Sequence, residues 1–155
     1  MGAALALTPL ATAQLTLVSN LPGAFVDISG TGTPLSLADD AEVDIVTTVG
    51  NALLPAGTVR VGSNGGVRFR GTGTELGITN QILPNIGAFS LDSQSLLPFW
   101  DDIDTEGGLW GEIYWQEVAG ALIVQWENAA FFNGSATQDR TTFQLQVPST
   151  GTTWA

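Results

Sequence analysis

Four carboxylates crowd a short stretch of the chain, Asp101, Asp102, Asp104 and Glu106, and glycines follow at positions 107 and 108. Alternate side chains of an extended turn share one side, so Asp102, Asp104 and Glu106 can converge on one hard cation such as calcium, which binds carboxylate oxygens. The helical calcium-binding loop, with its distal bidentate glutamate, is absent from the sequence. The three alternate carboxylates are therefore candidate calcium ligands. The alternative is a solvated turn in which Asp side chains accept hydrogen bonds from backbone amides.

Glycoside hydrolysis is the other chemistry that carboxylates can perform, and it needs two carboxyl groups about 5–10 Å apart across a cleft. The available side chains are Glu112, Glu117 and Glu127. They alternate with residues that we expect in the core, which places them on strand faces or at strand ends. The chain has no Cys and no His, so thiolate nucleophiles and imidazole bases are excluded. We therefore expect a protein that is not an enzyme.

The charge of the chain limits its partners. Fifteen acidic side chains stand against four arginines, which gives a net charge of −11. Such a charge repels phosphate backbones and anionic lipid headgroups. We therefore expect no nucleic acid and no membrane surface as partner, whereas divalent cations are attracted.

Short strands are the elements that must position these side chains. The chain has 155 residues, of which 44% are apolar and 12% charged, with 19 glycines and 7 prolines. This balance favours strands joined by turns over long helices, and the spacing of the alternating runs favours an antiparallel β-sandwich. We expect one domain over residues 21–155. The expected strands are Leu15–Val18, Ala24–Ile28, Glu42–Val49, Thr58–Val61, Val67–Arg70, Glu112–Gln116, Ala121–Glu127 and Thr141–Val147.

Alternation within the strands predicts which side chains enter the core. Phe143, Leu145 and Val147 share one face of the last expected strand, and Trp126 lies on the apolar face of the strand before it. We therefore expect Trp126 and Phe143 on adjacent or facing strands, and Trp115 in the core as well. The tryptophans expected at the surface or in contacts between molecules are Trp110 and Trp154.

Two short stretches carry the residues of tight turns. Ser63–Gly66 (SNGG) separates two expected strands and predicts a hairpin turn that needs a positive φ angle. Val118–Gly120 (VAG) predicts a second tight reversal.

Four segments carry ordered aromatic and acidic motifs. They are Leu96–Asp104 (LLPFWDDID), Gly111–Gln116 (GEIYWQ), Leu122–Asn128 (LIVQWEN) and Thr142–Leu145 (TFQL). Together they resemble the signature of the nidogen-type extracellular domain, and Ser63–Phe69 (SNGGVRF) is similar to an element of its bacterial secreted relatives. The resemblance implies an all-β module, extracellular or at the cell surface, in a family of matrix and adhesion proteins. It implies no catalytic activity.

The N-terminal residues 1–20 are apolar and carry no charged side chain. Ala3–Ala13 is similar to the apolar region and cleavage site of a signal peptide, but no Lys or Arg precedes it. We expect residues 1–20 to be an extended segment, either a donor strand or a retained leader. Thr8-Pro9 interrupts the stretch, which is too short for a membrane-spanning helix.

The sandwich is expected to lack one strand, because in the nidogen-type family another strand follows the TFQ motif, whereas here only Thr152–Ala155 follow the turn Ser149–Gly151. An open sheet edge is a template for another chain. Our leading hypothesis is a subunit of an extracellular homopolymeric filament, in which the N-terminal segment of one copy completes the sandwich of the next. The leucines expected to mediate polymerisation are Leu5, Leu7, Leu10, Leu15 and Leu17.

The alternative is a monomeric cell-surface module for adhesion or glycan binding, in which the N-terminal segment folds back onto its own sheet. A carboxylate-based glycoside hydrolase is the third class and the least favoured. Asn133-Gly134-Ser135 is a candidate glycosylation site.

Overall fold

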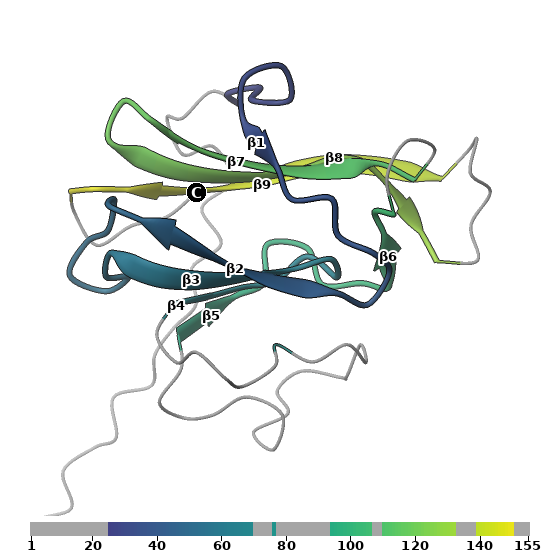
Figure 1. The fold of residues 1–155 in the computed structure, drawn as a ribbon, viewed down its shortest axis with the longest axis horizontal. Helices are drawn as coiled ribbons and strands as arrows, with labels where there is room; N and C mark the ends of the chain where they lie inside the picture. The colour runs from purple at the N-terminus through teal and green to yellow at the C-terminus, as the bar shows by residue number, and fades with distance from the viewer. Residues whose placement is uncertain (1–24, 70–75, 77–93, 107–109, 133–138, 151–155) are drawn as a thin grey trace, which may run out of the picture.

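Two antiparallel sheets packed against each other make up the fold (Figure 1). The computed structural model describes residues 25–69, 76, 94–106, 110–132 and 139–150. The sheet centred on β8, called the β8 sheet, consists of β1 (Thr33–Pro34), β6 (Ile103–Asp104), β7 (Glu112–Val118), β8 (Ala121–Phe131) and β9 (Arg140–Pro148). The other, called the β3 sheet, consists of β2 (Glu42–Thr47), β3 (Gly57–Gly62), β4 (Val67–Phe69) and β5 (Gln94–Leu96), paired in that order. The predicted all-β sandwich is confirmed.

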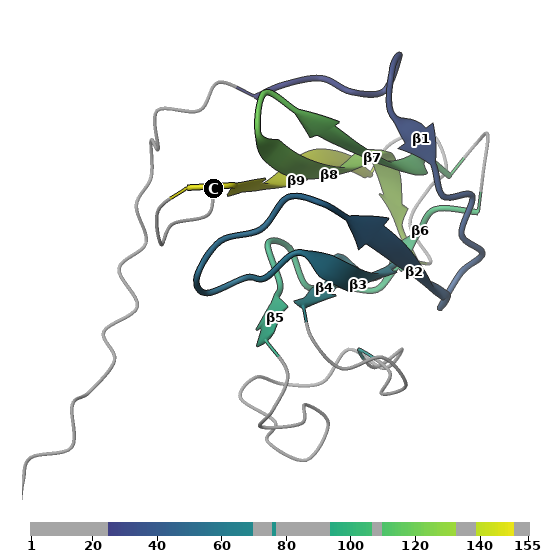
Figure 2. The same cartoon turned by 60° about the vertical axis from the view of Figure 1, so that its left-hand side comes forward.

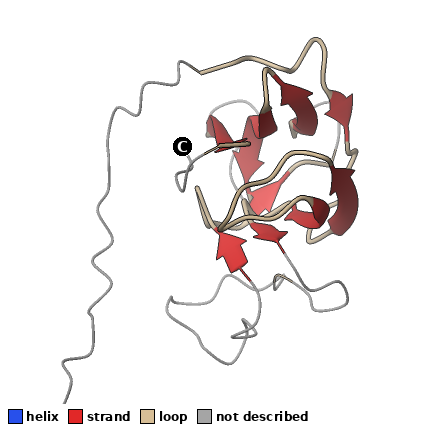
Figure 3. Cartoon of the chain, turned by 90° about the vertical axis from the view of Figure 1, so that its left-hand side faces the viewer, coloured by secondary structure: helices blue, strands red, loops and turns tan. Residues whose placement is uncertain are grey.

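Strands are the only regular elements in the described part of the chain, as the end view in Figure 3 shows. Within those residues, no helix has the length and apolar character needed to cross a membrane. Six of the expected strands are present, with ends that differ by no more than four residues. The strands that the sequence did not predict, β1, β5 and β6, are two or three residues long. Alternation cannot be recognised over so short a run.

The expected strand Ala24–Ile28 was wrong for the residues that the structure describes, because 25–28 form no strand. This segment crosses the outer face of the β8 sheet, where glutamine side chains take the place of a neighbouring strand. Gln144 accepts a hydrogen bond from Val26 N and donates one to Val26 O, both at 3.1 Å. Gln125 accepts a hydrogen bond from Ile28 N at 3.0 Å. Figure 2 shows the segment on the side of the β8 sheet that faces away from the β3 sheet. The expected strand Leu15–Val18 lies outside the described residues.

The core fills the space between the two sheets. β8 pairs with β7 along one edge and with β9 along the other, so Ile113, Trp126 and Phe143 lie in one row across the sheet. Trp126 is fully buried, and its ring stacks on Phe143 with centroids 4.9 Å apart. Trp115 is partly buried and packs against the same core. The expected placement of Trp126 beside Phe143 is therefore confirmed, and so is the contribution of Trp115 to the core.

Glu117, near the end of β7, joins the two sheets. Its carboxylate accepts hydrogen bonds from Thr47 Oγ1 at 2.7 Å, from Thr48 N at 2.6 Å and from Thr48 Oγ1 at 2.6 Å, all at the end of β2. These bonds, with the Thr48 side chain as the largest cause, lower the pKa of Glu117 from 4.5 to about 2. The ionised form of this side chain is thus the one that connects the sheets.

Replacing Trp126 by Ala should lower the free energy of unfolding by about 3–5 kcal/mol, because it removes a large buried ring and leaves a cavity. Urea unfolding followed by circular dichroism measures the loss. Trp115→Ala is the control and should cost less, because that side chain is only partly buried. Stability close to wild type in Trp126→Ala would contradict the packing.

Glu117→Gln should destabilise the protein at neutral pH and have little effect near pH 2. A carboxylate whose pKa is lowered by folding contributes stability above its unfolded value, and that contribution is lost as the pH falls through the folded value. The difference in urea midpoint between wild type and variant should therefore shrink between pH 4.5 and about pH 2. A difference that stays constant over this range would mean that the ionised carboxylate is not what holds Thr47 and Thr48.

Candidate functional site: a motif junction and a carboxylate cluster

The turn Ser63–Gly66 between β3 and β4 is buried and closely surrounded. Gly62 N donates to Gly66 O at 2.9 Å, and Ser63 N donates to Ala41 O at 2.9 Å. Gly65 has φ +79°, and a Cβ added there would lie 1.7 Å from Phe99 O. The predicted positive φ is confirmed, and position 65 accepts only glycine for reasons of both backbone conformation and space.

Three of the four motif segments found in the sequence meet at this turn, which we call the motif junction. Trp126 Nε1 donates to Gly62 O and to Ser63 O, each at 3.2 Å. Asn64 Oδ1 accepts a hydrogen bond from Ile103 N at 3.0 Å. Ring centroids of Phe99 and Phe143 lie 5.2 Å apart beside the turn. Because these motif groups are engaged with one another, the motifs hold the two sheets together.

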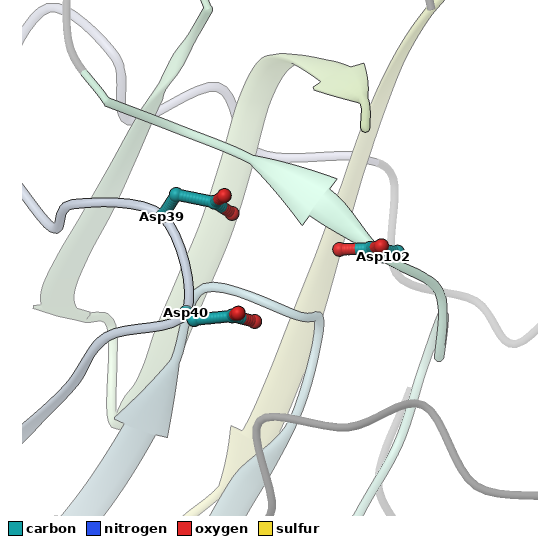
Figure 4. A group of neighbouring side chains, drawn as sticks. All are labelled: Asp39, Asp40 and Asp102. Atoms are coloured by element: carbon teal, nitrogen blue, oxygen red, sulfur yellow. The ribbon is translucent and has the colours of Figure 1, made fainter. Parts of the chain in front are cut away.

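A cluster of three carboxylates lies next to the junction (Figure 4). Asp39 and Asp40 come from the loop before β2, and Asp102 comes from the residue before β6. Oxygens of the three side chains lie within 4.8 Å of one another. Asn64 Nδ2 donates to Asp40 Oδ1 at 3.1 Å, so the motif junction positions one side of the cluster. Carboxylate oxygens are among the ligands that calcium binds.

Mutual repulsion and burial act on the cluster. Burial is the largest cause that raises the pKa of Asp39, followed by the charges of Asp104 and Asp40. Burial also raises the pKa of Asp102 most, followed by the charges of Asp40 and Asp101. The folded state therefore favours whatever neutralises these groups, which is either a proton or a bound cation.

Of the calcium ligands predicted from the sequence, only Asp102 lies in the cluster. Asp104 Oδ1 accepts a hydrogen bond from Glu106 N at 2.9 Å, which is the turn arrangement named as the alternative, and the Glu106 side chain is exposed. Asp39 and Asp40 stand side by side just before a strand, and they were not among the predicted ligands. Their adjacency was visible, but their approach to Asp102 depends on the packing of the two sheets. Calcium binding itself stays a prediction.

Of the glutamates considered for hydrolysis, Glu117 lies apart from the other two. Glu112 and Glu127 are cross-strand neighbours on the outer face of the β8 sheet. Glu112 accepts a hydrogen bond from Ser36 N at 2.8 Å, and Glu127 accepts one from Gln125 Nε2 at 2.8 Å. Glu117 is bound to Thr47 and Thr48 at the inter-sheet contact described above. A pocket of about 10 Å³, lined by Glu42, Asn64 and Trp100 among others, has room for about one water molecule.

Of the remaining candidate residues, one lies in the described part of the chain and the others lie outside it. Trp110, expected at the surface, is partly buried, and its carbonyl accepts a hydrogen bond from Ala130 N at 3.0 Å. The candidates outside the described residues are Leu5, Leu7, Leu10, Leu15, Leu17, Asn133 and Trp154.

Comparison with known proteins identifies the domain. A family model described as NIDO related matches residues 17–152, which is most of the chain and includes every motif segment. No curated protein matches the chain, and no solved structure does. The nidogen-like character expected from the motifs is confirmed.

Asp102→Asn should raise the melting temperature when calcium is removed by a chelator, because it removes a charge from a repulsive cluster. The raised pKa values of Asp39 and Asp102 add stability at low pH that is lost as the pH rises from about 3.8 through those values. The gain in the variant should therefore be largest at neutral pH. A second measurement adds calcium. If the cluster binds calcium, the melting temperature of the wild type should rise, whereas that of Asp102→Asn should not. A variant less stable than wild type in chelator would contradict the repulsion.

Proposed function

The chain belongs to the NIDO-related family as a nidogen-like β-sandwich, and we propose that it is a structural subunit of an extracellular homopolymer. In this proposal, residues 1–20 of one copy complete the sheet of the next copy. The observation that carries it is an edge strand, β9, which pairs only with β8 among the described residues. An exposed strand edge offers unpaired N–H and C=O groups to a further strand.

The use of the motif residues supports a structural role over a catalytic one. The aromatic and amide groups of the family motifs bind to each other at the motif junction, as the contacts of Trp126 and Asn64 describe. Because the motif side chains contact each other inside the domain, they are not available to a ligand, and we infer that function lies at the surface or at a sheet edge. The edge of the sheet is then the natural place for function.

A donor strand that differs from its acceptor edge makes a head-to-tail contact. Such a contact repeats from copy to copy and does not close unless the rotation happens to complete a ring. The chain has a net charge of −11, but residues 1–20 contain no charged side chain. Side-chain charges of the donor segment therefore add no repulsion between donor and acceptor. These features favour an open filament built from identical copies.

A monomeric adhesion or glycan-binding module is the second candidate. It is favoured by two aromatic side chains on the surface, Phe25 at 51% and Phe132 at 48% exposure, because exposed rings can stack on sugars. This module would remain a single copy in solution.

Deleting residues 1–20 should convert a polymer into a folded monomer, because it removes the donor and leaves the sandwich intact. Sedimentation velocity at micromolar concentration and negative-stain electron microscopy measure the change. A shorter deletion, of residues 1–14, separates the two halves of the segment, because it leaves Leu15 and Leu17 in place. The full-length chain sedimenting as a monomer at these concentrations would overturn the homopolymer and favour the adhesion module.

A further inference from the structure

Glutamines from three neighbouring strands form a row across the outer face of the β8 sheet, which we call the glutamine row. They are Gln116 on β7, Gln125 on β8 and Gln144 on β9. Gln125 and Gln144 are cross-strand neighbours, and Gln144 Nε2 donates to Gln125 Oε1 at 3.4 Å. A side-chain amide can both donate and accept, so such a row can bind the N–H and C=O groups of an extended main chain.

Residues 25–31, which we call the strap, lie on the glutamine row (Figure 2). Val26 N donates to Gln144 Oε1 and Gln144 Nε2 donates to Val26 O, both at 3.1 Å. Ile28 N donates to Gln125 Oε1 at 3.0 Å. Each of these acceptors and donors belongs to a strand of the sheet, so the row keeps its own backbone structure whichever strap it holds.

Side chains of the strap make the contact specific to its sequence. Asp27 Oδ1 accepts a hydrogen bond from Gln125 Nε2 at 3.0 Å, and Thr31 Oγ1 donates to Gln116 Oε1 at 2.9 Å. Ile28 is 1% exposed, and it does not belong to the core cluster between the sheets. The row therefore recognises an aspartate, a buried isoleucine and a threonine hydroxyl as well as main-chain groups.

A filled row is more stable than an empty one. Removing the strap exposes the Ile28 side chain to water, which is unfavourable for an apolar group. It also takes from Gln125 its bonds to Ile28 N and to the Asp27 carboxylate. A strap that leaves its own row is thus best replaced by a segment of the same sequence.

A glycine-containing turn joins the strap to β1 and can act as a hinge. Thr31 N and Gly32 N both donate to Ile28 O, at 3.1 and 2.7 Å. These two bonds lie within the turn. A Cβ added at Gly30 would meet no atom within 4 Å. Glycine adopts many backbone conformations, so opening the turn can carry the strap away from its own sheet at the loss of two local hydrogen bonds.

We propose that the glutamine row of one copy binds the strap of a second copy, so that the strap and residues 1–20 pass together to the neighbouring subunit. This rests on the proposed function for the role of residues 1–20. The bonds to the row are the same in either copy, so they do not by themselves favour exchange. The strap and residues 1–20 belong to one continuous segment, however, and their joint binding to the next copy is bivalent. The exchange is a domain swap, in which the rows within the filament stay filled.

The test uses two variants, each defective in one half of the contact. Ile28→Asp has a defective strap and an intact row. The double variant Gln125→Ala/Gln144→Ala has an intact strap and a defective row. The substituted side chains lie outside the core between the sheets, so both variants should fold, which circular dichroism verifies.

Each variant alone should be monomeric, because every copy lacks either a functional strap or a functional row. An equal mixture should form a one-to-one complex, in which the strap of the double variant binds the row of Ile28→Asp. The complex should stop at two copies, because the remaining strap and row are both defective. Sedimentation velocity at micromolar concentration measures these states. Val46→Asp is the control for an added charge, because Val46 is 69% exposed on β2, and it should assemble as the wild type does.

Three results separate the exchange from the homopolymer. Either variant assembling alone as the wild type does would overturn the exchange and leave the homopolymer standing. A mixture that stays monomeric beside a polymeric wild type would do the same. A monomeric wild type, together with a one-to-one complex in the mixture, would overturn the homopolymer and keep the row as a site for the strap of a second copy.

A labelled peptide of residues 25–32 provides a readout that needs no assembly. It should bind the Ile28→Asp chain, whose own strap is defective, and raise the fluorescence anisotropy of the label. The same peptide carrying Ile28→Asp should bind about tenfold more weakly or worse, because it buries no isoleucine side chain. Equal binding of the two peptides, or no binding of either, would overturn the glutamine row as a site for the strap.

Discussion

The hydrogen bonds from Trp126 to the turn of the opposite sheet are the interaction on which the rest of the described structure depends. The indole belongs to β8, yet its N–H is bound to Gly62 O and Ser63 O of the β3 sheet. A buried indole N–H without a partner would cost stability, so this bond fixes how the turn sits against β8. The turn in turn places Asn64, which binds both Ile103 N and Asp40. The position of the carboxylate cluster thus follows from the placement of one tryptophan.

The fold and the candidate site were predictable from the sequence to different degrees. The long strands and the turn at Ser63–Gly66 depend on residues close together in the chain, and both were predicted. The carboxylate cluster joins residues about sixty positions apart, Asp39 and Asp102, so spacing within the acidic run could not indicate that they approach each other. The segment Phe25–Ile28 has the alternation of a strand, but side-chain amides rather than a neighbouring main chain satisfy its backbone.

Placing carboxylates together beside a buried turn has an electrostatic cost that the fold must offset. Like charges and burial raise the pKa values of Asp39 and Asp102, whereas hydrogen bonds lower those of Asp27 and Glu117. The hydrogen-bonded groups stabilise the sandwich at neutral pH, and the clustered groups oppose it there. A divalent cation or protons would relieve this repulsion, and Asn64 positions Asp40 within the cluster.

The glutamines of the outer face hold the described segment 25–28 across the strands of the β8 sheet. A side-chain amide both donates and accepts, so Gln144 can satisfy the N–H and the C=O of Val26 as a strand would. Gln125 binds Ile28 N and the Asp27 side chain and is fully buried by the segment above it. Because these bonds come from the face of the sheet, the segment runs across the strands and does not extend the ladder. The described segment 25–28 therefore covers the outer face of the β8 sheet and is not one of its strands.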